Sequence, residues 1–164
     1  MGTSQREARD GSKERVQGAA MDIKDLLSPE AVFELRESDK ERVLKELARR
    51  AAGLLDIDPE TVTKALLKRE DLGSTGLGNG VALPHARIAN LEKAFGLFAL
   101  LKPAIPFDAI DERPVDLVFL LLLPEQLSEG LKPMACIARR LRDPVVAGKL
   151  RRAKGAVSYY TLLT

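Results

Sequence analysis

The amino-acid sequence predicts an α/β protein in which a central β-sheet lies between two sets of helices. Apolar residues recur at helical spacing in the first and last parts of the chain, and nearly continuous apolar runs lie between residues 94 and 123. Strands this apolar need cover on both faces, which helices before and after them can supply. We therefore expect an α/β sandwich.

The first helix is expected over residues 38–53. Core-forming residues begin at Met21, and residues 23–35 mix short helical and extended patterns without clear boundaries. Ser38 and Glu41 then form a capping box, and apolar residues follow at helical spacing. Because glycine favours the end of a helix, we expect Gly53 to stop this one.

A second helix should follow directly. Asp58 offers an N-cap, and Pro59 fits the first helical turn, where its missing N–H costs nothing. The helix should end near Gly73, because glycine again provides a stop. This boundary places Arg69 in the last turn or just beyond it.

The middle of the chain carries the strands. Residues 80–83 predict a strand or the entry to one, and residues 94–101 predict a buried strand that ends before Pro103. The segment 105–110 is expected to be a short edge piece, because proline disfavours a central position. Residues 115–123, VDLVFLLLL, give the strongest strand pattern, that of a strand covered on both faces.

Helices are expected again at the end of the chain. Residues 127–141 predict a helix whose first turns Pro133 interrupts, and Asp143 caps another helix that runs to about Ala153. Residues 159–164 close the chain with an apolar turn. The inward positions of the first of these helices are expected to be Leu131, Met134, Ala135, Ala138 and Leu141.

Composition limits the class of protein. With 164 residues and 45% hydrophobic side chains, the chain can bury a sizeable core as one domain. A net charge of +2 and 4% aromatic residues argue against nucleic acid as a partner. The single cysteine, Cys136, excludes an intrachain disulfide, fits a reducing compartment and is expected in the core. No apolar run approaches the roughly 18 residues of a spanning helix, so we expect a cytoplasmic protein without membrane insertion.

The chain divides into two parts. Residues 1–20 are charged and nearly free of large apolar side chains, so they cannot offset the entropy of ordering. We expect a disordered tail there, either an extended start of the protein or residues left from cloning. Residues 21–164 are expected to form one domain.

The stretch from Arg69 to Arg87, REDLGSTGLGNGVALPHAR, has the composition of an anion site on a loop. It contains the only histidine, His85, which Pro84 precedes. Backbone N–H groups of glycine-rich turns, hydroxyls and guanidinium groups all bind phosphate oxygens. The candidate phosphate-binding loop residues are Ser74, Thr75, Gly76, Gly78, Asn79 and Gly80.

Commoner motifs do not fit this loop. A nucleotide P-loop needs Lys and then Ser or Thr after its last glycine, but Val81 follows Gly80. A dinucleotide fingerprint fails because its third glycine is missing and Pro84 opposes a helix there. A metal site would need more ligands beside His85. A hydrolase triad with Ser74 and Asp71 is conceivable, yet the spacing matches no nucleophile elbow.

Two blocks of the sequence resemble one known family. GSTGLGNGVALPHAR is similar to the phosphorylation-site signature of the enzyme IIA proteins of the fructose/mannitol class in the bacterial phosphoenolpyruvate-dependent phosphotransferase system. IPFDAIDERPVDLVFLLLLPEQ resembles the nitrogen-regulatory branch of that class. The likeness covers most of residues 21–164. It implies a mixed β-sheet sandwiched between helices. We expect neither a cofactor nor a metal.

The resemblance also implies a function. In that family the signature histidine, His85 here, takes a phosphoryl group from the phosphohistidine of HPr or of its nitrogen-branch paralogue, with Nε2 expected to carry it. Arg69 matches the arginine that stabilises the phosphohistidine. The chain would then be a phosphocarrier, a component of a phosphotransferase, that signals to nitrogen and potassium metabolism through targets such as potassium transporters or sensor kinases.

Two alternatives stay open beside this regulatory phosphocarrier. The chain could be a sugar-specific IIA component that passes phosphate to a IIB domain for fructose or mannitol uptake. It could also be a regulatory binding module without transfer, because Gly130 stands where family members often carry a second histidine. The sequence names neither the target nor the oligomeric state.

Structural interpretations compete with some functional ones. Arg69 could be a favourable charge at a helix C-terminus. The carboxylates of Asp108, Asp111 and Asp116 fit turns and strand ends, although one could orient His85. A last set of basic residues fits a solvated helix face better than a surface for an acidic partner: Arg139, Arg140, Arg142, Lys149, Arg151, Arg152 and Lys154.

Overall fold

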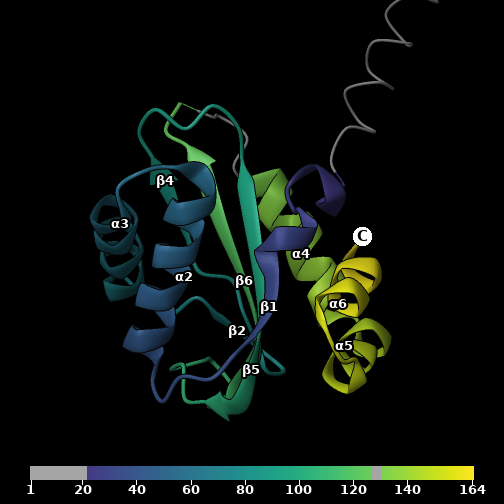
Figure 1. The fold of residues 1–164 in the computed structure, drawn as a ribbon. Helices are drawn as coiled ribbons and strands as arrows, with labels where there is room; N and C mark the ends of the chain where they lie inside the picture. Colours follow the sequence, from purple (N-terminus) through teal and green to yellow (C-terminus); the bar gives the residue numbers. More distant parts are fainter. Residues whose placement is uncertain (1–21, 127–130) are drawn as a thin grey trace, which may run out of the picture.

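A mixed six-stranded sheet forms the middle layer of the structure (Figure 1). The computed structural model describes residues 22–126 and 131–164, so the predicted tail over residues 1–20 lies outside the described residues. The strand order is β1-β5-β6-β3-β2, and β4 also pairs with β6. The strands are β1 (Val32–Leu35), β2 (Gly76–Gly78), β3 (Val81–Ala82), β4 (His85–Ile88), β5 (Phe95–Ile105) and β6 (Val115–Pro124).

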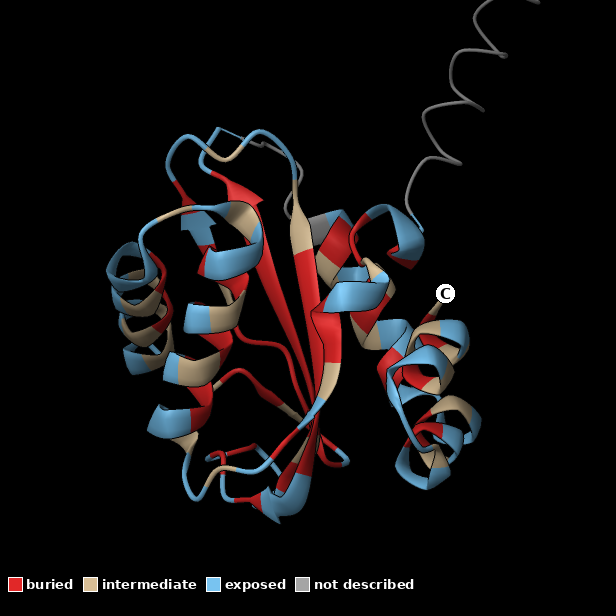
Figure 2. Cartoon of the chain, in the orientation of Figure 1, coloured by how far each residue is buried: buried red, intermediate tan, exposed pale blue. Residues whose placement is uncertain are grey.

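Helices cover both faces of this sheet, as the sequence predicts. Helices α2 and α3 lie on one side, and α4, α5 and α6 lie on the other (Figure 1). Burial follows these layers, with most of the central strands buried and the helices exposed on their outer sides (Figure 2). The helices are α2 (Lys40–Leu55), α3 (Pro59–Asp71), α4 (Leu131–Arg142), α5 (Pro144–Arg152) and α6 (Ala156–Leu163), and the short 3-10 turns η1 (Ile23–Asp25) and η2 (Pro29–Ala31) precede β1.

Strand β6 is the centre of the sheet and confirms the strongest strand prediction. Nine of its ten residues are buried, with Asp116 half-buried. It pairs antiparallel with β5 along one edge and parallel with β3 and then β4 along the other. Both faces and both edges of this apolar strand are therefore covered.

The prediction that β5 ends before Pro103 is wrong. The strand continues to Ile105, which pairs with Val115 after an irregularity that begins at Leu100. Strand β1 ends opposite Leu101. Among the described residues, no strand pairs with β5 on the β1 side beyond Leu101, so no ladder there requires the N–H that Pro103 lacks.

Both predicted ends of α2 need correction. The N-cap is Asp39 and not Ser38, because the Asp39 carboxylate accepts the Arg42 N–H at 2.9 Å. Gly53 does not stop the helix. The helix runs to Leu55 and ends at Asp56, which takes the left-handed conformation with φ 54°.

The predicted starts of α3 and α5 are confirmed. Asp58 accepts the Glu60 N–H and precedes Pro59, the first residue of α3. Asp143 accepts the Val145 N–H in the same way at the start of α5. Helix α3 ends at Asp71, so Arg69 lies in its last turn, as expected.

Helix α4 is described from Leu131, and the earlier part of the helix predicted over residues 127–141 lies outside the described residues. Ala135 is exposed, contrary to the prediction, whereas Ile137 is fully buried. The placement of Ile137 and Leu141 one turn apart defines the inward stripe. Within the described ranges, no helix is long and apolar enough to cross a membrane.

Two glycines allow a matched test of packing. Gly53 lies inside α2 with open space around an added methyl group, whereas a methyl group on Gly96 would lie 2.7 Å from the Phe119 ring. We expect Gly53→Ala to raise the free energy of unfolding by roughly 1 kcal/mol, because alanine favours a helix. Gly96→Ala should lower it by about 1–3 kcal/mol through overpacking. Urea denaturation measures both, and equal effects of the two substitutions would contradict the described packing.

A second stability test concerns Glu46 in α2. Hydrogen bonds from Arg49 and Arg50 lower the pKa of the Glu46 carboxyl from 4.5 to about 2, against the effect of burial. A lowered pKa stabilises the fold above the unfolded-state value, and this contribution is lost as pH falls from about 4.5 towards about 2. Glu46→Gln should therefore cost roughly 1 kcal/mol at pH 7 after solvent screening, and nothing near pH 2. Urea midpoints that fall equally at both pH values would refute this.

Candidate functional site

His85 is fixed by a hydrogen bond at each ring nitrogen. Its Nδ1 lies 2.9 Å from the Leu83 carbonyl oxygen, and the Arg69 Nε–H donates to its Nε2 at 3.3 Å. A guanidinium group can only donate, so Nε2 must be the acceptor and Nδ1 must carry the proton. The ring is half-buried. His85 is the first residue of strand β4, so the expectation that it lies on a loop is wrong.

The carbonyl that orients the ring is available because the backbone groups of successive residues alternate in direction, and those of Leu83 point away from β6. Both strands pair with β6 in one continuous register, from Val81 opposite Leu117 to His85 opposite Leu121. Between them, Pro84 has no N–H, and its carbonyl accepts from Leu121. The backbone groups of Leu83 turn away from this ladder and serve the site.

Arg69 reaches the ring from the last turn of α3. Its Nη1 donates to the Gly73 carbonyl at 2.9 Å while its Nε faces the ring. Among the described residues, no carboxylate forms an ion pair with Arg69. Arg87, the other arginine of the predicted site, donates to the Pro124 carbonyl at 3.2 Å instead.

The hydroxyl of Ser74 serves the fold in this structure. Its Oγ donates to the Phe107 carbonyl at 2.6 Å and accepts the Gly76 N–H at 3.0 Å. Gly76 lies so close to Ala109 that an added Cβ would be 2.8 Å from the Ala109 side chain. The glycine here permits close packing of two backbone segments, and a phosphate-binding role for either residue stays a prediction.

The turn between β2 and β3 makes its own contacts. Gly78, Asn79 and Gly80 all have positive φ. The Asn79 N–H donates to the Asp111 carboxylate at 2.8 Å, and a second backbone donor, the Arg113 N–H, also binds it. These hydrogen bonds hold the pKa of Asp111 below its usual value.

This turn does not lie beside His85. The Gly80 carbonyl accepts from Asp116, whereas His85 pairs with Leu121, five residues farther along β6. Five residues of parallel strand span roughly 16 Å. The phosphate-loop role of Gly78, Asn79 and Gly80 therefore gains no support from their position and stays a prediction.

The three aspartates Asp108, Asp111 and Asp116 lie in turns or near a strand end, as expected, and make separate contacts. Asp116 pairs with Arg151 at 2.9 Å, and Asp111 accepts from the turn described above. Asp108 pairs with Lys40 at 3.5 Å. The ring nitrogens of His85 have other partners, so the Leu83 carbonyl orients the ring in place of a carboxylate.

A buried carboxylate that the sequence does not single out lies beside Arg69. The Glu70 side chain is only 6% exposed and accepts from the Thr75 N–H, the Thr75 hydroxyl and the Lys40 ammonium group, each within 2.8 Å. Lys40 also donates to the Phe107 carbonyl. The only sequence signal was a charged residue directly after Arg69, which is common at a helix end.

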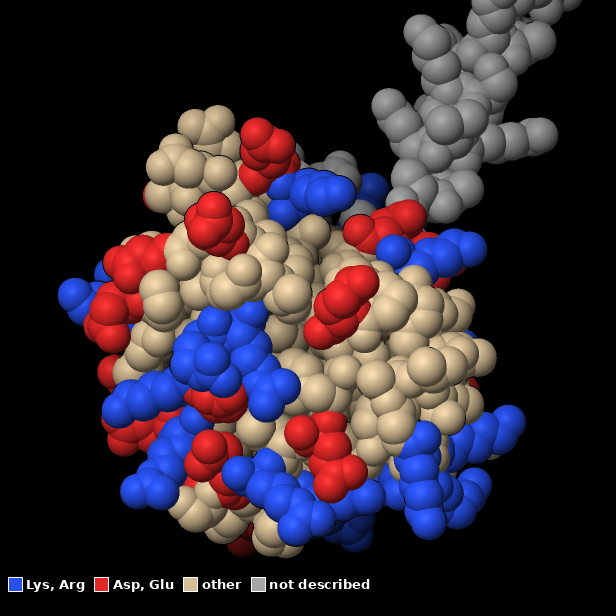
Figure 3. Space-filling view, viewed as in Figure 1, with Lys and Arg blue, Asp and Glu red and all other residues tan. Residues whose placement is uncertain are grey.

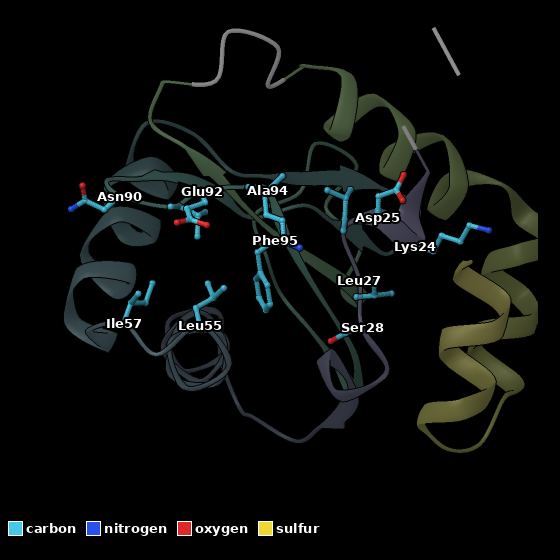
Figure 4. Close-up of a pocket in the computed structure, with 13 residues that line it drawn as sticks. Lys24, Asp25, Leu27, Ser28, Leu55, Ile57, Asn90, Glu92, Ala94 and Phe95 are labelled. Carbon is cyan, nitrogen blue, oxygen red and sulfur yellow. The ribbon is translucent and has the colours of Figure 1, made fainter. Parts of the chain in front are cut away.

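A cavity near η1 is separate from the His85 site. It has a volume of about 490 Å³ and is lined by η1, the end of α2 and residues 90–95. Its lining contains neither His85 nor Arg69 (Figure 4). In the described parts of the chain, no three metal-ligating side chains gather. The basic residues of α4 and α5 are all exposed, as expected of a solvated face, although Arg151 also pairs with Asp116, and basic side chains gather where α5 lies (Figure 3).

Comparison with known proteins identifies the family. Residues 25–164 match the family described as phosphoenolpyruvate-dependent sugar phosphotransferase system, EIIA 2. A nitrogen regulatory protein of Bradyrhizobium diazoefficiens is 48% identical over 145 residues, which cover 87% of this chain and 95% of that protein. These matches confirm the resemblance found in the sequence.

Solved structures agree. Nitrogen regulatory protein IIA-Ntr from Neisseria meningitidis matches with a TM-score of 0.82 and 31% identity over 87% of this chain and 99% of that one. The mannitol IIA protein of Escherichia coli, solved in complex with phosphorylated IIB, shares the fold, with a TM-score of 0.70 and 22% identity over 84% of this chain and 96% of that one. The chain therefore belongs to the EIIA 2 family of the phosphoenolpyruvate-dependent sugar phosphotransferase system, within its nitrogen-regulatory branch.

Proposed function

We propose that this protein is a regulatory phosphocarrier that accepts a phosphoryl group on Nε2 of His85 from HPr or from its nitrogen-branch paralogue. One observation carries the proposal. The only histidine of the chain is held with the proton on Nδ1, by the Leu83 carbonyl, and with the Nε2 lone pair facing a guanidinium group. Membership of the nitrogen-regulatory branch supports the same function.

The chemistry needs little beyond this arrangement. The Nε2 lone pair attacks phosphorus in line as the phosphorus–nitrogen bond of the donor breaks, and the electron pair of that bond returns to the donor imidazole. His85 needs no general base, because Nε2 carries no proton. Arg69 neutralises charge on the phosphoryl oxygens once Nε2 is bonded to phosphorus.

The second interpretation of Arg69, as a helix C-terminal charge, is compatible with its position in the last turn of α3. Its direct contact with Nε2 favours the functional one. Among the described residues it forms no ion pair that would compete for a phosphoryl group. We therefore assign Arg69 to stabilisation of the phosphohistidine.

The partners follow from the same proposal. Residues 21–164 would act as one domain that receives phosphate and then signals to nitrogen and potassium metabolism in the cytoplasm. The mannitol IIA protein in complex with phosphorylated IIB supports a sugar-specific alternative, in which phosphate passes to a IIB domain. The higher identity to a nitrogen regulatory protein, 48%, favours the regulatory function.

Replacement of His85 tests the phosphoacceptor. His85→Ala should abolish phosphate uptake and cost only about 1 kcal/mol of stability for the lost hydrogen bonds. The protein is incubated with phosphoenolpyruvate, enzyme I and either carrier, and intact mass follows an acid-labile, base-stable phosphoryl group. Labelling that persists in a folded His85→Ala variant would refute the assignment. Failure of the unaltered protein to take up phosphate would favour the binding-module alternative.

Replacement of Arg69 separates its two interpretations. Arg69→Ala should slow single-turnover uptake by roughly 100-fold, because it removes a preorganised charge next to the phosphoryl group. Lys68→Ala is the matched control, since Lys68 is an exposed cation in the same helical turn. An equal effect of the two substitutions on the uptake rate would return Arg69 to the role of a helix-end charge.

A further inference from the structure

We propose that Glu70 is the positioning residue of the His85 site, acting through Thr75 on one side and through the end of α3 on the other. The inference rests on the proposed function, because it explains how the ring and Arg69 are held ready for a phosphoryl group. Neither His85 nor Arg69 forms a hydrogen bond or an ion pair with the Glu70 side chain. The Glu70 carboxylate nevertheless anchors the backbone that supports both.

The carboxylate of Glu70 is built into the fold. It is 6% exposed, and its two oxygens accept three donors: the Thr75 N–H at 2.8 Å, the Thr75 hydroxyl at 2.7 Å and the Lys40 ammonium group at 2.7 Å. A nearly buried carboxylate with two hydrogen bonds and an ion pair is held in one position. Thr75 is therefore fixed at both its backbone and its side chain.

Thr75 passes this constraint to the ring through one further residue. The Thr75 carbonyl accepts the Leu83 N–H at 3.0 Å, and the Leu83 carbonyl binds Nδ1 of His85 at 2.9 Å. Leu83 lies between β3 and β4, and its own N–H and carbonyl point away from β6. Its orientation, and with it the tautomer of His85, depends on Thr75.

The same carboxylate also fixes the backbone from which the Arg69 side chain extends. Glu70 is the next residue in the last turn of α3, and its carbonyl also accepts the Gly73 N–H at 3.1 Å. Arg69 in turn donates to the Gly73 carbonyl. Anchoring Glu70 therefore holds the helix end and the following turn, from which the guanidinium group reaches Nε2.

Lys40 removes an electrostatic obstacle. An unpaired carboxylate one residue from Arg69 would compete for the guanidinium group and repel an incoming phosphoryl dianion. The Lys40 ammonium group neutralises Glu70 from the start of α2, where it also lies 4.7 Å from the Phe107 ring centre. The Arg69 guanidinium group therefore remains available to bind the phosphoryl group.

The test combines a rate with a direct measurement of the ring. In the unaltered protein, nitrogen-15 NMR of the single histidine should show the neutral ring protonated on Nδ1. Glu70→Ala should slow single-turnover uptake by roughly 10- to 100-fold and give a mixture of the two tautomers. Glu70→Gln should recover part of both effects, because an amide still accepts from the Thr75 N–H.

Glu46→Ala is the matched control, since Glu46 is another largely buried glutamate that pairs with basic side chains but has no contact with the site. It should lower stability without changing the uptake rate or the tautomer. If Glu70→Ala does not fold, Thr75→Val tests the same path, because it removes the hydroxyl and keeps the N–H. This variant should also give a mixture of the two tautomers. It should slow uptake, but less than Glu70→Ala does.

The outcomes separate the inference from the proposed function. A folded Glu70→Ala or Thr75→Val variant with the original tautomer and an unchanged rate would overturn the positioning role while the phosphocarrier stands. No uptake by the unaltered protein would overturn the phosphocarrier. The tautomer measurement would then still decide whether Glu70 sets the geometry of the ring.

Discussion

The need to cover one strand organises this molecule. Strand β6 is apolar on both faces, so it demands helices on both sides and paired strands along both edges. One of those edges is supplied in two pieces, β3 and β4, in a single register. Between these two pieces the Leu83 carbonyl points away from β6, and it fixes the ring of His85. The pairing that the core requires therefore also places the carbonyl that orients the ring.

Much of the fold could be predicted because its signals are local. The apolar run of β6 and the Asp-Pro caps of α3 and α5 are read directly from the sequence. The predicted ends of elements are wrong where a tertiary contact decides where the element ends. Pro103 is tolerated in β5 only because β1 ends opposite Leu101, and Gly53 continues a helix that Asp56 terminates. Neither neighbour can be identified from the residues alone.

The candidate site was predicted in part for the same reason. His85 and Arg69 stand out by residue type, and the structure brings them together. The glycines and hydroxyls of the loop suggested a phosphate cradle, yet Ser74 binds the Phe107 carbonyl. Glu70 offered no signal, because its partners Thr75 and Lys40 meet it only after the helices pack. Composition therefore locates the chemistry but does not show which residues support it.

The arrangement also explains how a phosphoryl group could be read by a partner. In the described state, the Nε2 lone pair is the acceptor for Arg69. A phosphorus–nitrogen bond uses that lone pair, so Arg69 must exchange its partner for a phosphoryl oxygen when His85 is phosphorylated. Nδ1 and the Leu83 carbonyl keep their contact through this exchange, since they lie on the other side of the ring. In the proposed function, phosphorylation would therefore change the contacts of Arg69 and leave the supporting backbone as it is.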